Sequence, residues 1–113
     1  MHKTRIDLPE KTRKKVVNLL SVRLADSIDL YLQVKQAHWN VKGPHFIALH
    51  ELFDEIGEVV ENGVDELAER LTTLGGVAEG TAPVVAKRSS LEAYPLDIFS
   101  GPEHLEALAN ALA

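Results

Sequence analysis

The sequence of 113 residues contains no cysteine, few aromatic side chains and no long uninterrupted run of apolar residues. Without cysteine the chain cannot form a disulfide scaffold, an iron–sulfur cluster or a cysteine zinc site, and it fits a reducing compartment such as the cytoplasm. A membrane-spanning helix needs about 18 apolar residues in a row, so we expect no membrane partner. Arg23 and Asp26 interrupt the stretch after the basic start, which therefore does not resemble a secretory signal.

Charge is distributed unevenly, although 45% hydrophobic and 26% charged residues are ordinary for one globular domain. The first 15 residues hold six basic and two acidic side chains, a net charge of +4, whereas the remaining 98 hold six basic and 15 acidic ones, a net charge of −9. We treat residues 1–8 as a basic N-terminal arm. The basic segment could contact nucleic acid or another acidic surface, or it could be a solvated, frayed terminus, and the sequence leaves both open.

The first long helix is predicted from a capping pattern and from the spacing of apolar residues. Asp7 and Glu10 have the spacing of a capping box, with Pro9 in the first turn. The helical pattern ends near Ala37 or His38, and residues 40–44 (Asn-Val-Lys-Gly-Pro) break it. The apolar positions are Val17, Leu20, Leu24, Ile28 and Tyr31.

The second long helix has the clearest periodicity in the chain. Pro44 suits its first turn, and Gly75 with Gly76 ends it. Its apolar side chains fall within about 80° of arc on the helical wheel. They are Leu49, Phe53, Ile56, Val60, Val64, Leu67, Leu71 and Leu74. Because the connection between the two helices is short, we expect an antiparallel helical hairpin.

The remaining third of the sequence is less regular. Residues 75–89 show no period and are interpreted as a linker, and residues 89–92 could cap a short helix that stops near Tyr94 and Pro95. Ser100 and Glu103 form a further capping box, which opens a helix running to residue 113. Two long helices and the start of another do not close a bundle core. We therefore expect either further chain or partner subunits to supply the missing surface.

An acidic stripe on the second helix carries the candidate chemistry. Eight carboxylates and no Lys or Arg occur between Glu51 and Glu69. Six residues share a stripe about 100° wide that points away from the apolar side of the helix. We call these residues the acidic stripe: His50, Asp54, Glu58, Glu61, Asp65 and Glu69. Such a run is most often a solvated face, but like charges at i,i+4 destabilise a helix unless something offsets them.

A histidine and a carboxylate at i,i+4 can ligate one metal ion from a single helix face, and His50 with Asp54 has that spacing. His38, at the end of the first helix, is the obvious third ligand because the short turn could fold it back. Asp65 and Glu69 form a second i,i+4 pair about 22 Å further along the same helix. One ion cannot use both pairs from one chain.

A two-fold axis would bring the two pairs together. If the second helices of two copies cross antiparallel near Val60, the acidic pair of one chain meets the histidine–aspartate pair of the other. Gly57 and Gly63 lie symmetrically about this crossing. They either allow close helix approach there or are simply weak positions of the helix. The other histidines, His2, His45 and His104, are interpreted as solvated.

The string HWNVKGPHFIALHELFDE at residues 38–55, followed by VDELAERLTTLGG and GTAPVV, resembles the Dps family (DNA-binding proteins from starved cells), which are mini-ferritins. The family spacing H-x11-H-x3-D-x10-D-x3-E is met by His38, His50, Asp54, Asp65 and Glu69. The resemblance implies an all-α, ferritin-like four-helix bundle, as one domain over residues 1–113 that is incomplete at its C-terminus. It would hold the first two long helices, a short crossover helix near residues 90–98 and the start of the third.

The resemblance also implies iron chemistry. Family members assemble twelve subunits into a hollow shell, oxidise Fe(II), preferably with hydrogen peroxide, and store the ferric mineral inside. The ferroxidase centre at the dimer interface would take His38, His50 and Asp54 from one chain. Asp65 and Glu69 would come from the other, and zinc or another divalent metal could substitute for iron. Trp39 matches a family tryptophan beside this centre, with packing as its default role.

Two other functions stay open. Some family members compact DNA, so the chain could be a DNA-binding shell protein with a mainly structural role, associated with the nucleoid. The basic residues available for phosphate contacts are Lys11, Arg13, Lys14 and Lys15. The third interpretation is a bare helical interaction module in which the acidic stripe is only solvated.

Overall fold

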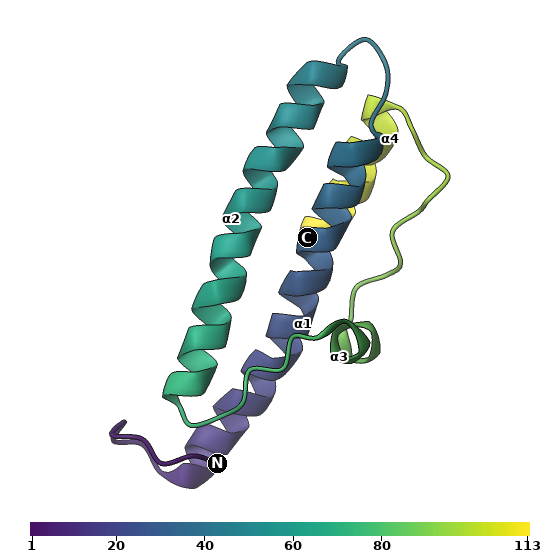
Figure 1. The fold of residues 1–113 in the computed structure, drawn as a ribbon. Helices are drawn as coiled ribbons and strands as arrows, with labels where there is room; N and C mark the ends of the chain where they lie inside the picture. The colour runs from purple at the N-terminus through teal and green to yellow at the C-terminus, as the bar shows by residue number, and fades with distance from the viewer.

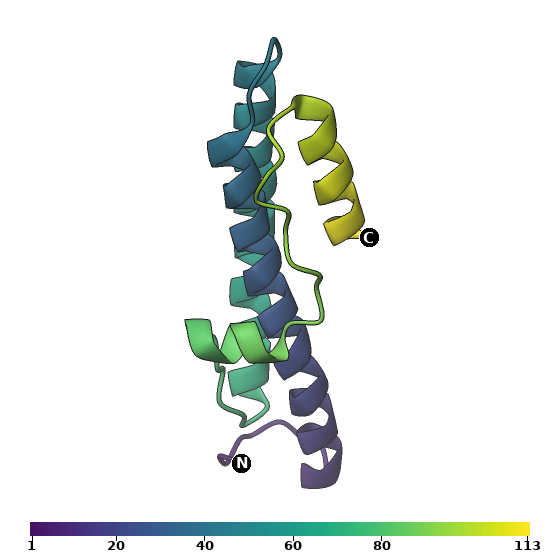
Figure 2. The ribbon, with the colours of Figure 1, turned by 90° about the vertical axis from the view of Figure 1, so that its right-hand side faces the viewer.

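The computed structural model describes residues 1–113 as four helices without a strand, confirming the predicted all-α class (Figure 1). Helices α1 (Glu10–Asn40) and α2 (Phe46–Thr73) form the predicted antiparallel hairpin, in a molecule 55 × 23 × 21 Å across. Helix α3 (Ala82–Arg88) crosses one side of the hairpin, and α4 (Gly101–Leu112) lies beside the half nearest the α1–α2 turn (Figure 2). None of the helices is both long and apolar enough to cross a membrane.

The ends of the long helices differ from the prediction in detail. The predicted capping box at the start of α1 does not form, because Pro9 occupies the N-cap position without a side-chain cap. Helix α1 continues to Asn40, and α2 begins at Phe46, so Pro44 lies in the turn rather than in the helix. The predicted glycine stop is confirmed: Gly75 adopts a φ of +94°, the left-handed conformation that commonly ends a helix.

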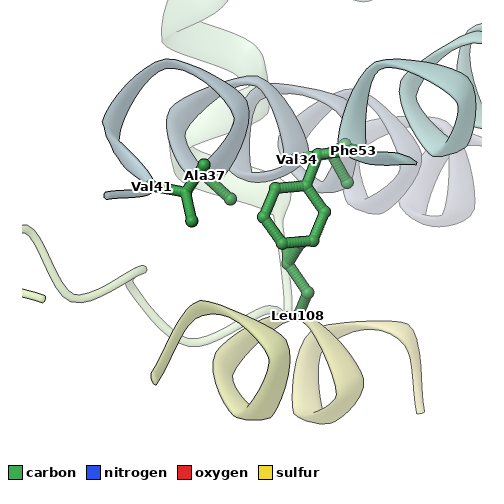
Figure 3. Close-up of a cluster of buried hydrophobic side chains, with 5 residues drawn as sticks. All are labelled: Val34, Ala37, Val41, Phe53 and Leu108. Carbon is green, nitrogen blue, oxygen red and sulfur yellow. The ribbon is translucent and has the colours of Figure 1, made fainter. Parts of the chain in front are cut away.

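A small apolar cluster fixes α1, α2 and α4 to one another (Figure 3). The Phe53 ring of α2 points toward Leu108 of α4, and both side chains are almost fully buried. The other members come from the end of α1 and the residue after it: Val34, Ala37 and Val41. Since these α1 residues flank His38 in the sequence, the cluster holds the turn end of the hairpin.

The crossover helix lies earlier in the chain than predicted. It is α3, inside residues 75–89 that were interpreted as a linker, and residues 90–98 contain no helix. Pro83 in the first turn of α3 favours a helix start there. No helix follows Ser89 and Ser90 directly, and their hydroxyls donate to Asp29 and Asp26 of α1.

We call residues 89–100 the strap, since they tie α3 to α4 across the side of α1 (Figure 2). Gln33 of α1 is buried and donates through Nε2 to the carbonyl of Glu92 at 3.0 Å. Further along, the backbone N–H of Lys42 donates to the carbonyl of Phe99 at 2.8 Å. Polar bonds to the hairpin therefore hold much of the strap.

The start of α4 follows the prediction, with one exception. Ser100 and Glu103 form both bonds of the capping box. His104, interpreted from the sequence as solvated, is only 1% exposed. Gly101, His104 and Leu108 are the buried residues of α4. They recur at helical spacing, so the ring belongs to the face turned toward the rest of the molecule.

Candidate metal centre

Two histidines meet at the turn end of the hairpin. The rings of His38 and His50 stack with their centroids 3.8 Å apart and an interplanar angle of 18°. Nδ1 of His38 lies 2.6 Å from the carbonyl oxygen of His50, and Nδ1 of His50 lies 2.8 Å from the carbonyl oxygen of His38. The two residues therefore hold each other in a reciprocal arrangement.

This arrangement fixes the hydrogen on each ring. A carbonyl oxygen can only accept, so Nδ1 of each imidazole must carry the hydrogen and donate it. In the neutral ring Nε2 is then the nitrogen with a free lone pair, which is the form that binds a metal ion. The carbonyl of His38 belongs to the last turn of α1 and has no partner within the helix, so the His50 ring also caps this helix end.

Asp54 lies one turn beyond His50 and already has a partner. Nζ of Lys35, on α1, donates to its carboxylate at 2.8 Å. The hydrogen bond and charge of Lys35 hold the pKa of Asp54 below its ordinary value, with smaller contributions from His38 and His50. Lys35 was not among the residues predicted for this site. Its position three residues before His38, on the same side of a helix, is the signal that could have found it.

The structure brings two of the five predicted ligands, His38 and His50, into contact, with Asp54 one helical turn beyond His50 and the other two further away. Asp65 and Glu69 are exposed further along α2, as are Glu58 and Glu61 of the acidic stripe. Within one chain no three His, Asp or Glu side chains gather closely enough to hold a metal ion. The predicted set of five ligands therefore stays a prediction for a pair of chains.

The two glycines of α2 have different surroundings. A Cβ at Gly57 would meet Val34, Lys35 and Tyr31 of α1 at 3.6–3.9 Å, so this glycine is buried inside the hairpin. A Cβ at Gly63 would meet nothing within 4 Å. Gly57 thus packs against α1 of its own chain, at distances that would also accommodate a Cβ. Trp39, whose default role was packing, is 63% exposed beside His38.

The N-terminal arm is not frayed but folds back onto the far end of the hairpin. The N–H of His2 donates to the carbonyl of Gly75 at 2.7 Å. The hydroxyl of Thr4 donates to the backbone carbonyl of Thr73 at 2.8 Å. The guanidinium of Arg13 donates to the carbonyls of Leu8 and Leu74. Of the predicted DNA contacts, Arg13 is thus engaged within the chain, whereas the other three are exposed: Lys11, Lys14 and Lys15.

Comparisons with known proteins give the family. The family model of the ferritin-like domain matches residues 17–113. The "DNA protection during starvation protein" of Agrobacterium fabrum is 48% identical over 107 residues, which are 95% of this chain and 66% of that protein. The Dps of Mycobacterium smegmatis superposes with a TM-score of 0.92 at 36% identity, over 98% of this chain and 67% of that one.

A Dps protein from Vibrio cholerae O1, a member of a broad superfamily of ferritin-like diiron-carboxylate proteins, superposes with a TM-score of 0.90 at 28% identity. That match covers 98% of this chain and 69% of that one. The chain thus spans about two thirds of these relatives, and it contains the first two long helices of the predicted bundle. The sequence match and the shared fold together place the chain in the ferritin-like family, among the Dps proteins.

Proposed function

We propose that the chain oxidises Fe(II) at a centre formed between two copies and stores the ferric product. The observation that carries this proposal is the reciprocal histidine pair, in which both Nδ1 atoms face backbone carbonyls and both Nε2 atoms are left for a metal ion, with Asp54 one helical turn beyond His50. Two imidazoles and a carboxylate suit Fe(II), and zinc or another divalent ion could take the same place. The relatives named for DNA protection and for diiron-carboxylate chemistry support the choice of iron.

The second half of the centre comes from a partner copy in this proposal. Asp65 and Glu69 lie exposed on α2, far from the histidines of their own chain, as the two-fold arrangement requires. Their carboxylates would complete a ligand set of two imidazoles and three carboxylates. Anionic oxygen ligands favour Fe(III) over Fe(II), which helps the oxidation proceed. The net charge of −5 also attracts cations toward the protein.

Each part of the chain has a defined task in this reaction. The two backbone carbonyls orient the imidazoles, and the carboxylates neutralise the charge of the substrate ions. Lys35 donates to Oδ1 of Asp54, so it can orient this carboxylate while the other oxygen, Oδ2, binds an ion. One hydrogen peroxide oxidises two Fe(II) ions and is reduced to two waters, taking up two protons. Storage requires the shell of subunits, for which we propose the dodecamer in the cytoplasm.

Anaerobic addition of Fe(II) followed by hydrogen peroxide tests the reaction. We expect ferric absorbance to rise well above a protein-free blank, and to fall to the blank in His50→Ala and in Asp65→Ala. Matched controls are His45→Ala and Glu66→Ala, which remove exposed neighbours of the same chemical type outside the ligand set. If wild type gives no absorbance above the blank, the chain is not a ferroxidase. Equal activity of His50→Ala and His45→Ala would exclude this site.

Mixing the two inactive variants tests whether the centre is shared. A dimer of one His50→Ala chain and one Asp65→Ala chain has one site with both defects and one intact site. Random pairing should therefore restore about one quarter of the wild-type activity. No recovery in a preparation shown to contain mixed dimers would contradict the shared centre.

DNA binding is a second candidate function, favoured by the exposed lysines at the start of α1. Lys11, Lys14 and Lys15 lie close together in the sequence on an otherwise acidic protein. We expect a triple Lys→Gln variant to lose retardation of duplex DNA and wild-type binding to weaken steeply with salt. The charge-matched control replaces the exposed residues Lys42, Arg70 and Lys87. Equal retardation by both triple variants would exclude the proposed DNA contact.

A further inference from the structure

A buried histidine outside the metal centre has no role in the proposed reaction. The His104 ring lies in the first turns of α4, and its side chain is almost fully buried. The hydroxyl of Tyr94, in the strap, lies 2.6 Å from its Nδ1, and the two rings are stacked with an interplanar angle of 14°. This contact links the strap directly to α4.

The protonation of the pair follows from its surroundings. Burial raises the pKa of Tyr94 to about 12, so the phenol stays protonated. Its O–H donates a hydrogen bond to Nδ1 of His104, the unprotonated nitrogen of the ring. The imidazole is therefore neutral, with its own hydrogen on Nε2. That Nε2 is buried and has no hydrogen-bond partner. A second proton would have to go to Nδ1, the nitrogen that accepts from the phenol, and would create a buried cation.

The neighbours of the ring give little support to such a cation. Burial lowers the pKa of His104, and the carbonyl of Ile98 and the charge of Glu103 oppose this without reversing it. The carboxylate of Glu103 is already engaged with the backbone N–H of Ser100. From the strap the ring faces a phenol, and the cluster on which Tyr94 packs is apolar: Val34, Ala37, Val41, Phe53 and Leu108.

We propose that the Tyr94–His104 pair is an acid-operated latch, in which protonation of His104 releases α4 and the second half of the strap from the α1–α2 hairpin. The hairpin itself is held by buried apolar residues at both ends, among them Leu24, Phe53 and Leu71, which do not titrate. By contrast, Leu108 is the one residue that α4 contributes to the buried cluster. Loss of the latch therefore opens this part of the molecule first.

The pH range of the latch follows from the direction of the pKa shift. The folded state binds the proton less readily than the unfolded state, whose histidine titrates at the ordinary value of 6.5. The stabilising effect of the latch is complete above this value, and it is lost as the pH falls from 6.5 toward the lower pKa of the folded state. The latch is therefore closed at neutral pH and opens in mild acid.

Hydrogen exchange of the metal-free chain tests the latch. Between about pH 7.5 and about pH 5.5, after correction for intrinsic exchange rates, we expect opening of residues 101–112 to increase about tenfold. Opening of α2 residues near Leu71 should change little. In His104→Asn the amide oxygen takes the place of Nδ1 and cannot be protonated, so the acid response of α4 should disappear. His45→Asn, at an exposed histidine, should keep it.

A measurement on the unmodified chain covers the case in which His104→Asn fails to fold. Nuclear magnetic resonance should show His104 in the neutral form with hydrogen on Nε2 at neutral pH, and its titration should begin only below pH 6.5. Titration at or above 6.5 would overturn the latch. So would an acid response of α4 that persists in His104→Asn, or opening of α2 and α4 in equal measure.

Discussion

The hairpin and the strap with α4 are held to the molecule in different ways. The two long helices bury apolar side chains along much of their length, from Leu24 to Leu71. The strap depends on single polar bonds, such as Ser90 to Asp26 and Tyr94 to His104. Apolar burial is insensitive to pH and spread over many atoms, whereas each polar bond depends on one donor and one acceptor. We therefore expect the two regions to unfold under different conditions.

Phe53→Ala should have the largest effect, because Phe53 serves both regions. Its ring is 1% exposed and meets α4 as well as α1 in the shared cluster. Removing a buried aromatic ring lowers the free energy of unfolding by about 3–5 kcal/mol. Urea denaturation followed by circular dichroism measures this loss. Survival of the hairpin at full stability would mean that the cluster holds only α4.

Leu108→Ala should separate the two regions. Leu108 is the one residue that α4 contributes to the cluster, and we expect a loss of about 2 kcal/mol, the low end of the usual range, because α4 can undock. Hydrogen exchange should show faster opening of α4, with little change in α2. Equally faster opening of α2 and α4 would show that the two helices unfold as one unit.

Asp26→Ala tests the strap at its other end. Burial raises the pKa of Asp26, but hydrogen bonds from Ser90 and the contact with Arg23 outweigh this, so the net shift is downward. The bond to Ser90 is thus fully formed above the ordinary aspartate value of 3.8 and is lost as the pH falls below it. We expect a loss of about 1–2 kcal/mol at neutral pH, measured by urea denaturation. A loss unchanged at about pH 2.5 would contradict the role of the carboxylate.

Lys14→Ala should have the smallest effect and serves as the reference for polar contacts. Lys14 and Glu10 form an exposed i,i+4 pair on α1 at 3.6 Å. Such pairs contribute at most about 0.5 kcal/mol in water. A loss as large as that of Asp26→Ala, in the same urea titration, would remove the distinction between strap bonds and surface pairs.

The predictions from the sequence succeed where one physical rule dominates. The apolar periodicity of α2 and the glycine stop at Gly75 were predicted because helix burial and a positive φ leave direct marks in the sequence. The crossover helix was misplaced because Ser89 and Ser90 have the local pattern of a helix cap. In the structure Asp26 and Asp29, 60 or more residues earlier, accept from these hydroxyls and hold the serines against α1.

The candidate site, too, was predicted only in part from the sequence. The pair His50 and Asp54 was predicted because residues on one helix face share a fixed spacing, and their role as ligands stays a prediction. The contact of Lys35 with Asp54 and the reciprocal bonding of His38 with His50 could not be predicted from spacing, since they depend on how two helices lie against each other. The buried position of His104 was missed for a similar reason. From sequence alone, a polar residue on a helix is expected to be exposed. His104 is buried because Tyr94, a partner from another segment, contacts it.

The sequence by itself determined the helical hairpin and the two i,i+4 pairs of candidate ligands, because periodicity and spacing along one chain are local properties. Only the tertiary structure decided which polar groups meet. It placed Lys35 on Asp54, Arg13 on the carbonyl of Leu74 and Tyr94 on His104. The physical reason is that a hydrogen bond or ion pair forms over about 3 Å, a distance that the fold sets and the order of residues does not.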